Sequence, residues 1–286
     1  MPSVRDLRDR IRSLKNTQQI TKAMKQVAAA KIRRAEMLKN QSRPYADAIG
    51  AMLQDLIANV GSVDHPFMKP GKSGAPTGII LMTADKGLAG AFNANLIRQA
   101  ETFQRDDANV RWYPVGNKGR NAARRMPQET IEAWPLTSRS KLDVAREVAS
   151  KVSDDFFSGA IGKIVLISPK LINMMSQRPE VRNIVPIEST GEKKTTTGPT
   201  SAVEFEPSAE GVLSRILPKY LEFTIYAAML ETDAAFFAAQ LVAMNNATEN
   251  AKKIIDELTI QMNNARQASI TKEILEIVGG AEALAG

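Results

Sequence analysis

Apolar residues near the C-terminus recur at alternating steps of four and three residues, and this rhythm holds from residue 216 to residue 265. The average step of 3.5 residues is the period of a coiled coil, whereas a helix lying on a globular core follows a period near 3.6. A helix of this length extends over about 75 Å, so it needs a partner of similar length. The members of this C-terminal seam are Ile216, Tyr220, Phe223, Ala227, Leu230, Ala234, Phe237, Leu241, Met244, Thr248, Ala251, Ile255, Leu258, Met262 and Ala265.

A second seam with the same rhythm begins close to the N-terminus and predicts the partner helix. Ser3 and Asp6 are spaced as a capping box, which predicts that the helix begins there. Pro44 lacks an N–H group and clashes with the preceding turn, so we expect a bend or an interruption near residue 43. The members of this N-terminal seam, five of them polar, are Val4, Leu7, Ile11, Leu14, Gln18, Thr21, Lys25, Ala28, Ile32, Ala35, Lys39, Ser42, Ala46, Ile49, Leu53, Leu56 and Val60.

Opposite net charges on the two predicted helices favour their pairing. Residues 1–43 hold twelve basic and three acidic residues, whereas residues 208–286 hold six basic and ten acidic residues. Complementary charges that flank a seam favour pairing and set the choice of partner. The alternative is two separate amphipathic helices that lie on a core, although such helices would drift out of a strict 3.5-residue phase.

Between residues 77 and 187 the pattern changes to short apolar runs that alternate with helical segments. Strands that alternate with helices indicate a mostly parallel sheet covered by helices. At one edge we expect a hairpin that turns at Arg178-Pro179-Glu180. The predicted strands are 78–84, 110–115, 163–168, 171–176 and 181–187, and the predicted helices are 89–105, 117–125 and 141–158.

Two linkers rich in polar residues, Gly and Pro isolate this central unit, at residues 61–76 and 189–207. The sequence therefore predicts an α/β fold with long helices, in which a Rossmann-like α/β domain is inserted between two helices that form an antiparallel left-handed coiled coil. The expected segments are an N-terminal coiled-coil helix over 1–60, a central α/β domain (the foot) over 77–187 and a C-terminal coiled-coil helix over 208–286.

Residues suited to catalysis are scarce. The chain has no Cys, and its only histidine, His65, lies in a linker, so we expect neither a catalytic triad nor a metal site. The turn over 83–93 follows the first strand, where glycines can hold phosphate, but it does not match G-x-G-x-x-G. We therefore expect a tight turn and no catalytic residues, metal or cofactor. A nucleotide-binding enzyme built on residues 77–187 stays as an alternative.

The basic N-terminal helix would also suit a nucleic-acid partner. Its basic residues alternate with an apolar seam and no aromatic set is available for base stacking, so we expect no nucleic acid. A coiled-coil scaffold or nucleic-acid-associated protein is the alternative function. No apolar run approaches the 18 or so residues that cross a bilayer, and no signal-peptide pattern is present, so we expect membrane association only through partners.

Two long motifs, one near each end of the chain, resemble signatures of the γ subunit of F-type ATP synthases. The first is Ser-Leu-Lys-Asn-Thr-Gln-Gln-Ile-Thr-Lys-Ala-Met-Lys-Gln-Val-Ala-Ala-Ala-Lys-Ile-Arg-Arg-Ala-Glu, over residues 13–36. The second begins at Met244-Asn-Asn-Ala-Thr-Glu-Asn-Ala and resumes at Asn264-Ala-Arg-Gln-Ala-Ser-Ile-Thr-Lys-Glu-Ile-Leu-Glu-Ile-Val-Gly-Gly-Ala281. The segment from Asp85 to Asn93 resembles the Gly-rich turn of that family.

The resemblance implies a non-catalytic rotor subunit of the central stalk, which couples proton-driven rotation of the c ring to ATP synthesis or hydrolysis. In that family the two terminal helices lie inside a ring of α and β subunits, where the ATP chemistry takes place. The α/β domain lies at the base with the ε subunit, on the c-subunit ring. We therefore expect a peripheral position on the cytoplasmic face of the bacterial inner membrane.

The resemblance also implies contacts for residues at matching motif positions. Arg266, Gln267 and Thr271 resemble the polar contacts of the family to an acidic loop of the β subunit. An Arg beside an amide and a hydroxyl can bind carboxylates by charge-assisted hydrogen bonds. The alternative is that these are simply exposed polar positions of a helix.

Five further residues are carried over in the same way. Lys22, Met24 and Lys25 belong to the N-terminal motif, and we expect them to face either the surrounding ring or the packed side of the shaft. Phe205 and Glu206 resemble the foot segment near ε and the c ring.

Overall fold

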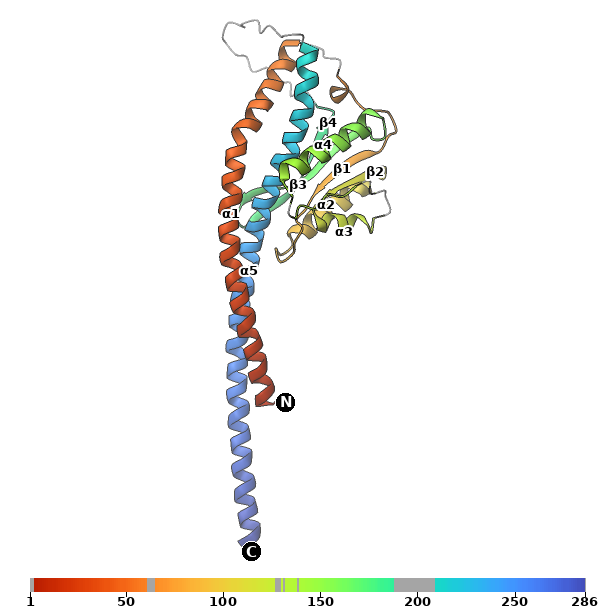
Figure 1. Ribbon diagram of the computed structural model, residues 1–286. Helices are drawn as coiled ribbons and strands as arrows, with labels where there is room; N and C mark the ends of the chain where they lie inside the picture. The colour runs from red at the N-terminus through yellow and green to blue at the C-terminus, as the bar shows by residue number, and fades with distance from the viewer. Residues whose placement is uncertain are drawn as a thin grey trace. The chain divides into compact units, whose positions relative to one another are not determined.

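Long helices occupy both ends of the chain, and a sheet with shorter helices lies between them in sequence (Figure 1). The computed structural model describes residues 3–60, 65–126, 130, 132–137, 139–187 and 209–285. The elements are α1 (Val4–Val60), the 3-10 helix η1 (Pro66–Met68), β1 (Thr77–Met82), α2 (Phe92–Asp106), β2 (Val110–Val115), α3 (Asn117–Ala123), α4 (Lys141–Phe157), β3 (Lys163–Asn173), β4 (Ser176–Val185) and α5 (Ala209–Ala285).

The capping box at the start of α1 is confirmed. The backbone N–H of Asp6 donates to Ser3 Oγ at 3.1 Å, and the N–H of Ser3 donates to Asp6 Oδ2 at 3.1 Å. These bonds to Ser3 lower the pKa of the Asp6 carboxyl. The interruption expected at Pro44 is not found, since α1 runs through it to Val60. Pro44 is exposed, so the carbonyl that loses its helical donor can bind water instead.

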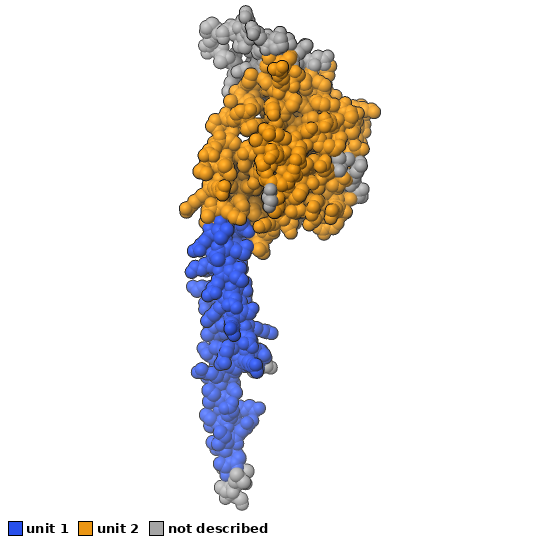
Figure 2. Space-filling view, in the orientation of Figure 1, with its two compact units in different colours: residues 1–28, 240–286 blue, residues 29–239 orange. Residues whose placement is uncertain are grey.

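The chain forms two compact units, drawn in different colours in Figure 2. Unit 1 combines residues 1–28 with 240–286, and unit 2 comprises residues 29–239. Each unit therefore contains one part of α1 and one part of α5. The three segments expected from the sequence divide the chain differently, because they follow elements rather than contacts, and they stay a prediction.

Within unit 1, α1 and α5 run antiparallel. The Thr248 hydroxyl donates to Thr21 Oγ1 at 2.8 Å, and Lys25 Nζ donates to Asn245 Oδ1 at 2.6 Å. A step of four residues up α1 thus corresponds to a step of three down α5, as the two seams require. Both contacts lie within the seam or one residue from it, so the polar seam residues Thr21 and Lys25 pair with polar residues of α5.

Within unit 2, the same two helices are joined by polar and aromatic contacts. Lys39 Nζ lies 2.5 Å from Glu231 Oε2. The Tyr45 and Phe223 rings have centroids 4.0 Å apart. Lys31 Nζ lies 5.4 Å from the centroid of Phe237, a cation–π distance.

Burial follows both seams closely. In α1, every described seam side chain from Val4 to Leu53 is buried or half-buried, and every fully buried residue belongs to the seam. In α5, every seam side chain from Ile216 to Ala265 is likewise buried or half-buried, but so is every other residue between Tyr220 and Asn245. The seam members Phe223, Phe237 and Thr248 contact α1, so the 3.5-residue pattern predicted the face that meets α1 correctly.

The sheet has the strand order β2-β1-β3-β4, in which β1 is parallel to both β2 and β3. The mostly parallel, helix-covered sheet is confirmed, with β4 antiparallel at one edge. The expected turn at 178–180 is wrong, because the chain turns at Met174-Met175, where Asn173 opposes Ser176. Pro179 instead lies inside β4, and an edge strand tolerates a residue without an N–H.

Two apolar cores lie on the two faces of the sheet, because successive strand residues point to opposite faces. The first core holds Ile80, Tyr113 and Leu166 with residues of α4, and the second holds Ile79, Trp112 and Val165 with residues of α2. Helix α5 contributes to both cores, which the sequence pattern alone did not indicate. Its first-core residues are Leu213, Leu217, Leu221, Ile225, Ala228 and Met229, and its second-core residues are Ala235, Phe236 and Ala239.

Ion pairs attach α4 to α5. Arg146 Nε of α4 donates to Glu222 Oε1 of α5 at 2.9 Å, and Glu222 Oε2 accepts from Lys219 Nζ of its own helix at 2.7 Å. Lys141 Nζ lies 2.7 Å from Asp233 Oδ2. Burial raises the pKa of the Glu222 carboxyl, but the hydrogen bonds from Lys219 and Arg146 outweigh burial and lower the pKa overall.

The expectation that no segment is apolar enough to cross a membrane needs a correction. By length and composition alone, α5 has one such window within Gly211–Ala281. Just over half of that window, 56%, is buried inside the protein. This part of α5 is apolar because it packs against α1 on one side and against the sheet on another.

Candidate partner-binding site

The C-terminal part of α5 continues beyond its pairing with α1. The contacts of Thr21 and Lys25 fix a register in which Val4, at the start of α1, lies opposite Ala265. From Arg266 to Ala281, every side chain is exposed. A helical segment of this length is only marginally stable in water without tertiary contacts. Residues 266–281 are therefore the first candidate for a partner-binding site.

The apolar face of α5 changes direction at the point where the pairing ends. Continuing the seam past Ala265 by four and three residues reaches Ser269, Lys272 and Glu276, which are all polar. Contacts on this polar side join Ser269 to Glu273 at 3.2 Å and Lys272 to Glu276 at 3.5 Å. At about 100° per residue, the apolar residues instead fall on the other side of the helix. The residues on that side are Ile270, Ile274, Ile277 and Val278, with 46–71% of their surface exposed. Leu275, 66% exposed, lies between the two sides.

We call these four apolar residues the terminal stripe. A contiguous exposed apolar surface of this kind marks an interaction site. Arg266, Gln267 and Thr271 lie in the first turns of the same segment, and all three are exposed. By helical position, Arg266 and Thr271 border the terminal stripe and Gln267 lies within it. The structure therefore brings the three predicted polar contacts together on the side that faces away from the seam.

The three residues predicted near the N-terminus have different surroundings. Lys25 is half-buried in the seam and donates to Asn245, so it belongs to the packed side of the helix pair. Met24 is half-buried and Lys22 is exposed. Two large apolar residues nearby, Ile20 and Val27, are 60% and 53% exposed. An apolar outward face is thus also present on α1. The predicted foot residues Phe205 and Glu206 lie outside the described residues.

The glycine-containing turn after β1 is held by its own polar groups. The N–H of Ala84 donates to Asn93 Oδ1 at 3.0 Å, and Asn93 Nδ2 donates to the Lys86 carbonyl at 3.1 Å. Asp85 accepts from the N–H groups of Asn117 and Leu136 at 2.8 and 3.0 Å. The Asp85 carboxylate thus already binds the Asn117 N–H at the start of α3, which a bound anion would otherwise use. The arrangement supports the tight-turn interpretation of residues 83–93.

Gly116, directly after β2, lets the backbone pass close to Thr83 at the end of β1. Gly116 has a φ of +92°, which side chains disfavour, and a Cβ placed there would lie 2.2 Å from the carbonyl oxygen of Thr83. The Thr83 hydroxyl in turn accepts from the N–H of Gly119 at 2.7 Å. Phe236 of α5 packs against Phe92, with ring centroids 5.8 Å apart, so α5 covers the first turn of α2.

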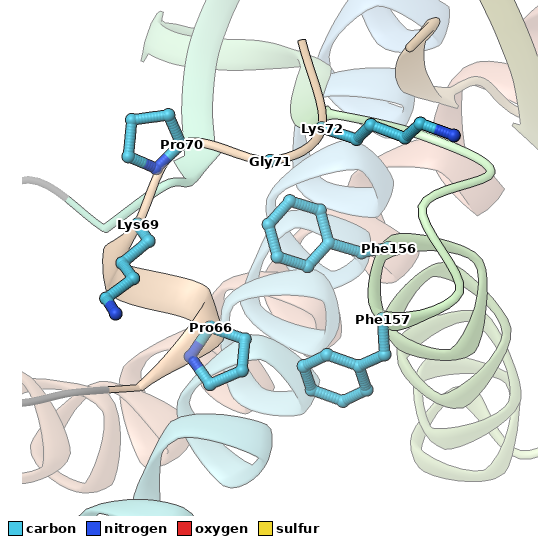
Figure 3. Close-up of a pocket in the computed structure, with 7 residues that line it drawn as sticks. All are labelled: Pro66, Lys69, Pro70, Gly71, Lys72, Phe156 and Phe157. Atoms are coloured by element: carbon cyan, nitrogen blue, oxygen red, sulfur yellow. The ribbon is translucent and has the colours of Figure 1, made fainter.

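A pocket of about 670 Å³ lies between η1, the loop that follows it and the end of α4 (Figure 3). Phe156 and Phe157 line one side, and Pro66 and Pro70 line the other. Lys69 and Lys72 are its charged residues. The lining offers ammonium groups and apolar surface but no carboxylate, imidazole or hydroxyl that could act with the lysines in acid–base or nucleophilic catalysis.

His65 has a structural position beside this pocket. Its Nδ1 accepts the N–H of Phe67 at 3.1 Å and so caps η1. Only a neutral imidazole with an unprotonated Nδ1 can accept this bond. Burial lowers the pKa of His65, which favours the same neutral form. Among the described residues, no three His, Cys, Asp or Glu side chains are grouped as metal ligands would be.

Taken together, the fold and the exposed stripes define a class of protein: a long antiparallel helix pair with an inserted α/β domain, whose outward apolar faces are suited to other subunits. A family model described as ATP synthase matches residues 3–284. The ATP synthase gamma chain of Heliobacterium modesticaldum is 43% identical, and that of Desulforamulus reducens 42%; each alignment covers 99% of this chain and 100% of the relative. The chain belongs to the ATP synthase gamma-chain family.

Solved structures show the same fold at lower sequence identity. A chain from the central stalk and c-ring structure of the Tetrahymena thermophila mitochondrial ATP synthase has a TM-score of 0.63 at 23% identity, covering 80% of this chain and 99% of that one. A chain from the Euglena gracilis mitochondrial ATP synthase has a TM-score of 0.66 at 17% identity, covering 98% and 94%.

Proposed function

We propose that this chain is the non-catalytic rotor subunit in the central stalk of an ATP synthase. Rotation of a proton-driven c ring turns the chain inside a ring of α and β subunits, and ATP is made or hydrolysed in that ring. The observation that carries the proposal is the change of apolar face at residue 266. A helix whose apolar residues leave the side of its partner requires another protein to cover them. Relatives named ATP synthase gamma chain support this role.

The surrounding ring contacts both long helices in this proposal. Ile20 and Val27 on α1, and the terminal stripe on α5, are the apolar surfaces that the ring covers. The seam residues between the helices stay packed, and a left-handed supercoil keeps them in contact over many turns. Packing and partner binding are thereby assigned to different faces of the same helices.

Arg266, Gln267 and Thr271 form the polar contact to the ring. A guanidinium, an amide and a hydroxyl on one side of a helix can hold an acidic loop of the β subunit by charge-assisted hydrogen bonds. Lys22, which is exposed, is a second candidate for such a contact. Met24 and Lys25 act mainly in packing the helix pair.

The α/β domain forms the foot of the rotor in this proposal. It contacts the ε subunit and the c ring, and the segment with Phe205 and Glu206 contributes to that contact. The assembly is peripheral to the cytoplasmic face of the bacterial inner membrane, and this chain reaches the membrane only through its partners.

Co-expression with the α and β subunits of a bacterial ATP synthase tests the role. We expect a stoichiometric complex whose ATPase activity depends on this chain. A chain that folds but does not enter the complex would contradict the proposal and favour the scaffold alternative. Titration calorimetry of the isolated chain with ATP should show no binding, because the turn after β1 lacks the spacing of a phosphate-binding loop and Asp85 already binds the amide at the start of α3.

The contact at Arg266 has a separate test with a matched control. Arg266→Ala removes a cation that borders the terminal stripe, and Lys272→Ala removes one from the polar side of the same exposed segment. Loss of a charge-assisted hydrogen bond is worth about 1.5–3 kcal/mol, so we expect ATP synthesis by the Arg266→Ala complex to fall at least about tenfold. The Lys272→Ala complex should stay near wild type. Equal rates in the two variants would refute the assignment.

A further inference from the structure

The distal half of the β3–β4 hairpin extends beyond the rest of the sheet. Strand β1 pairs with β3 only as far as Ile167, and the remainder of β3 pairs with β4 alone. Pro169 lies opposite Pro179, and neither residue has an N–H to donate. This pair is therefore at a non-hydrogen-bonded position of the ladder. By alternation, the N–H of Leu171 points away from β4, to the side where β1 has already ended.

Glu231 of α5 supplies the missing acceptor. The backbone N–H of Leu171 donates to Glu231 Oε1 at 2.8 Å. The other oxygen, Oε2, lies 2.5 Å from Lys39 Nζ on α1. The Glu231 side chain is only 21% exposed, and that of Lys39 34%. A single carboxylate thus connects α1, α5 and the hairpin of the α/β domain, and both of its oxygens are used.

The position of Glu231 along α5 is also distinctive. Helix α5 contributes to the first core up to Met229 and to the second core from Ala235 onward, so Glu231 lies where the helix passes from one core to the other. The neighbouring acids Glu222 and Asp233 bind residues of α4. The ion pair between Lys39 and Glu231 joins α1 to α5.

We propose that Glu231 is the positioning residue that transmits load between the α/β domain and both long helices. The proposal rests on the rotor function proposed above, because only a rotating shaft must pass torque through this junction. Apolar contacts have no preferred direction. Charge-assisted hydrogen bonds have fixed geometry, so the two bonds of Glu231 oppose relative movement of the three elements.

Three substitutions separate the two bonds. Glu231→Ala removes both, whereas Glu231→Gln keeps an amide oxygen for the Leu171 N–H and loses the charged pair. Lys39→Ala removes the same charged pair from the other side. Glu180→Ala is the matched control, because Glu180 is on the same hairpin and binds Lys170 at 3.1 Å without reaching either long helix.

The first measurement is proton pumping per ATP hydrolysed, in membranes carrying the complete complex with each variant. We expect Glu231→Ala to lower this ratio at least twofold while ATP hydrolysis is retained. Glu231→Gln and Lys39→Ala should give the same smaller decrease, and Glu180→Ala none. A ratio for all three variants equal to that of Glu180→Ala would overturn the proposal. If Glu231→Ala does not assemble, Glu231→Gln and Lys39→Ala decide the matter.

The second measurement is hydrogen exchange of the Leu171 amide in the isolated chain, which does not depend on the rotor function. Exchange should accelerate at least tenfold in Glu231→Ala and stay near wild type in Glu231→Gln. Unchanged exchange in Glu231→Ala would show that the bond is absent in solution and would overturn the proposal. Failure of the wild-type chain to support pumping contradicts the rotor function instead, so the two failures are distinguishable.

Discussion

Ile11 and Ile20 are the same residue type on the same helix of unit 1, and they test whether packing and partner binding use different faces. Ile11 lies in the N-terminal seam and is 8% exposed, whereas Ile20 faces outward and is 60% exposed. Substitution of either by Ala removes three carbon atoms. For a buried side chain the transfer free energy is about 0.8 kcal/mol per carbon, or ~2.4 kcal/mol in all.

Two corrections give the expected values. Ala favours the helix over Ile by about 0.4 kcal/mol, which offsets part of the loss. The cavity left at Ile11 adds an unfavourable term, so Ile11→Ala should destabilise the helix pair by about 2–3 kcal/mol. At Ile20 only about two-fifths of the transfer term applies, ~1 kcal/mol, so Ile20→Ala should change stability by at most about 0.5 kcal/mol.

Hydrogen exchange of α1 amides in unit 1 measures this difference directly. A loss of about 2–3 kcal/mol should accelerate exchange roughly 30- to 150-fold in Ile11→Ala, if these amides exchange through opening of the helix pair. Ile20→Ala should show less than about a threefold change. In the assembled ATP synthase, Ile20→Ala should weaken association with the α/β ring more than Ile11→Ala does. Equal acceleration in the two variants would refute the division into faces.

Three further predictions concern unit 2. The pKa of Glu222 is lower in the folded state than in the unfolded state, so its ionised carboxylate stabilises the fold above the unfolded-state pKa and this contribution is lost as the pH falls through the folded-state pKa. Glu222→Gln should abolish this pH dependence of thermal unfolding below about pH 5. The pKa of His65 is also lowered, so the hydrogen bond that it accepts from the Phe67 N–H stabilises the fold above about pH 6.5 and is lost on acidification. His65→Asn keeps an acceptor that does not titrate, so the melting temperature of this variant should change less between about pH 5 and 7. Gly116→Ala should destabilise unit 2 by more than about 3 kcal/mol in urea unfolding, whereas Gly50→Ala, in a helix with open space around it, should stabilise α1 by up to about 1 kcal/mol.

Much of the helix pair was predictable because its signal is periodic. A residue in a coiled-coil seam meets the same environment every seven residues, so many positions repeat the same information. Even the polar seam position Lys25 is half-buried where the spacing predicts.

The hairpin turn and an interruption of α1 at Pro44 were mispredicted because local propensity was overridden by context. Pro179 is a strong turn signal, but its strand lies at the edge of the sheet and opposite Pro169, where no N–H is required. Pro44 is a strong helix breaker, but it is exposed and the flanking seam residues keep the helix packed. In both cases the surroundings removed the penalty on which the prediction depended.

The polar junctions were not predictable by any pattern. Glu231, Leu171 and Lys39 are distant in sequence, and each is an ordinary residue for its element. The same is true of the cap that His65 gives to η1, because a histidine in a Pro-rich linker has no characteristic spacing. Such contacts depend on where the fold places single atoms.

The sequence by itself determined which faces of α1 and α5 meet and that a mostly parallel sheet lies between them in the chain. These features follow from repetition, because each is encoded by many residues that share one periodicity. The tertiary structure decided that α5 also covers both cores of the α/β domain, that the hairpin continues past β1, and that Glu231 binds the amide left there. The physical reason is that hydrogen bonds and ion pairs act over about 3 Å, and only the folded chain brings those atoms that close.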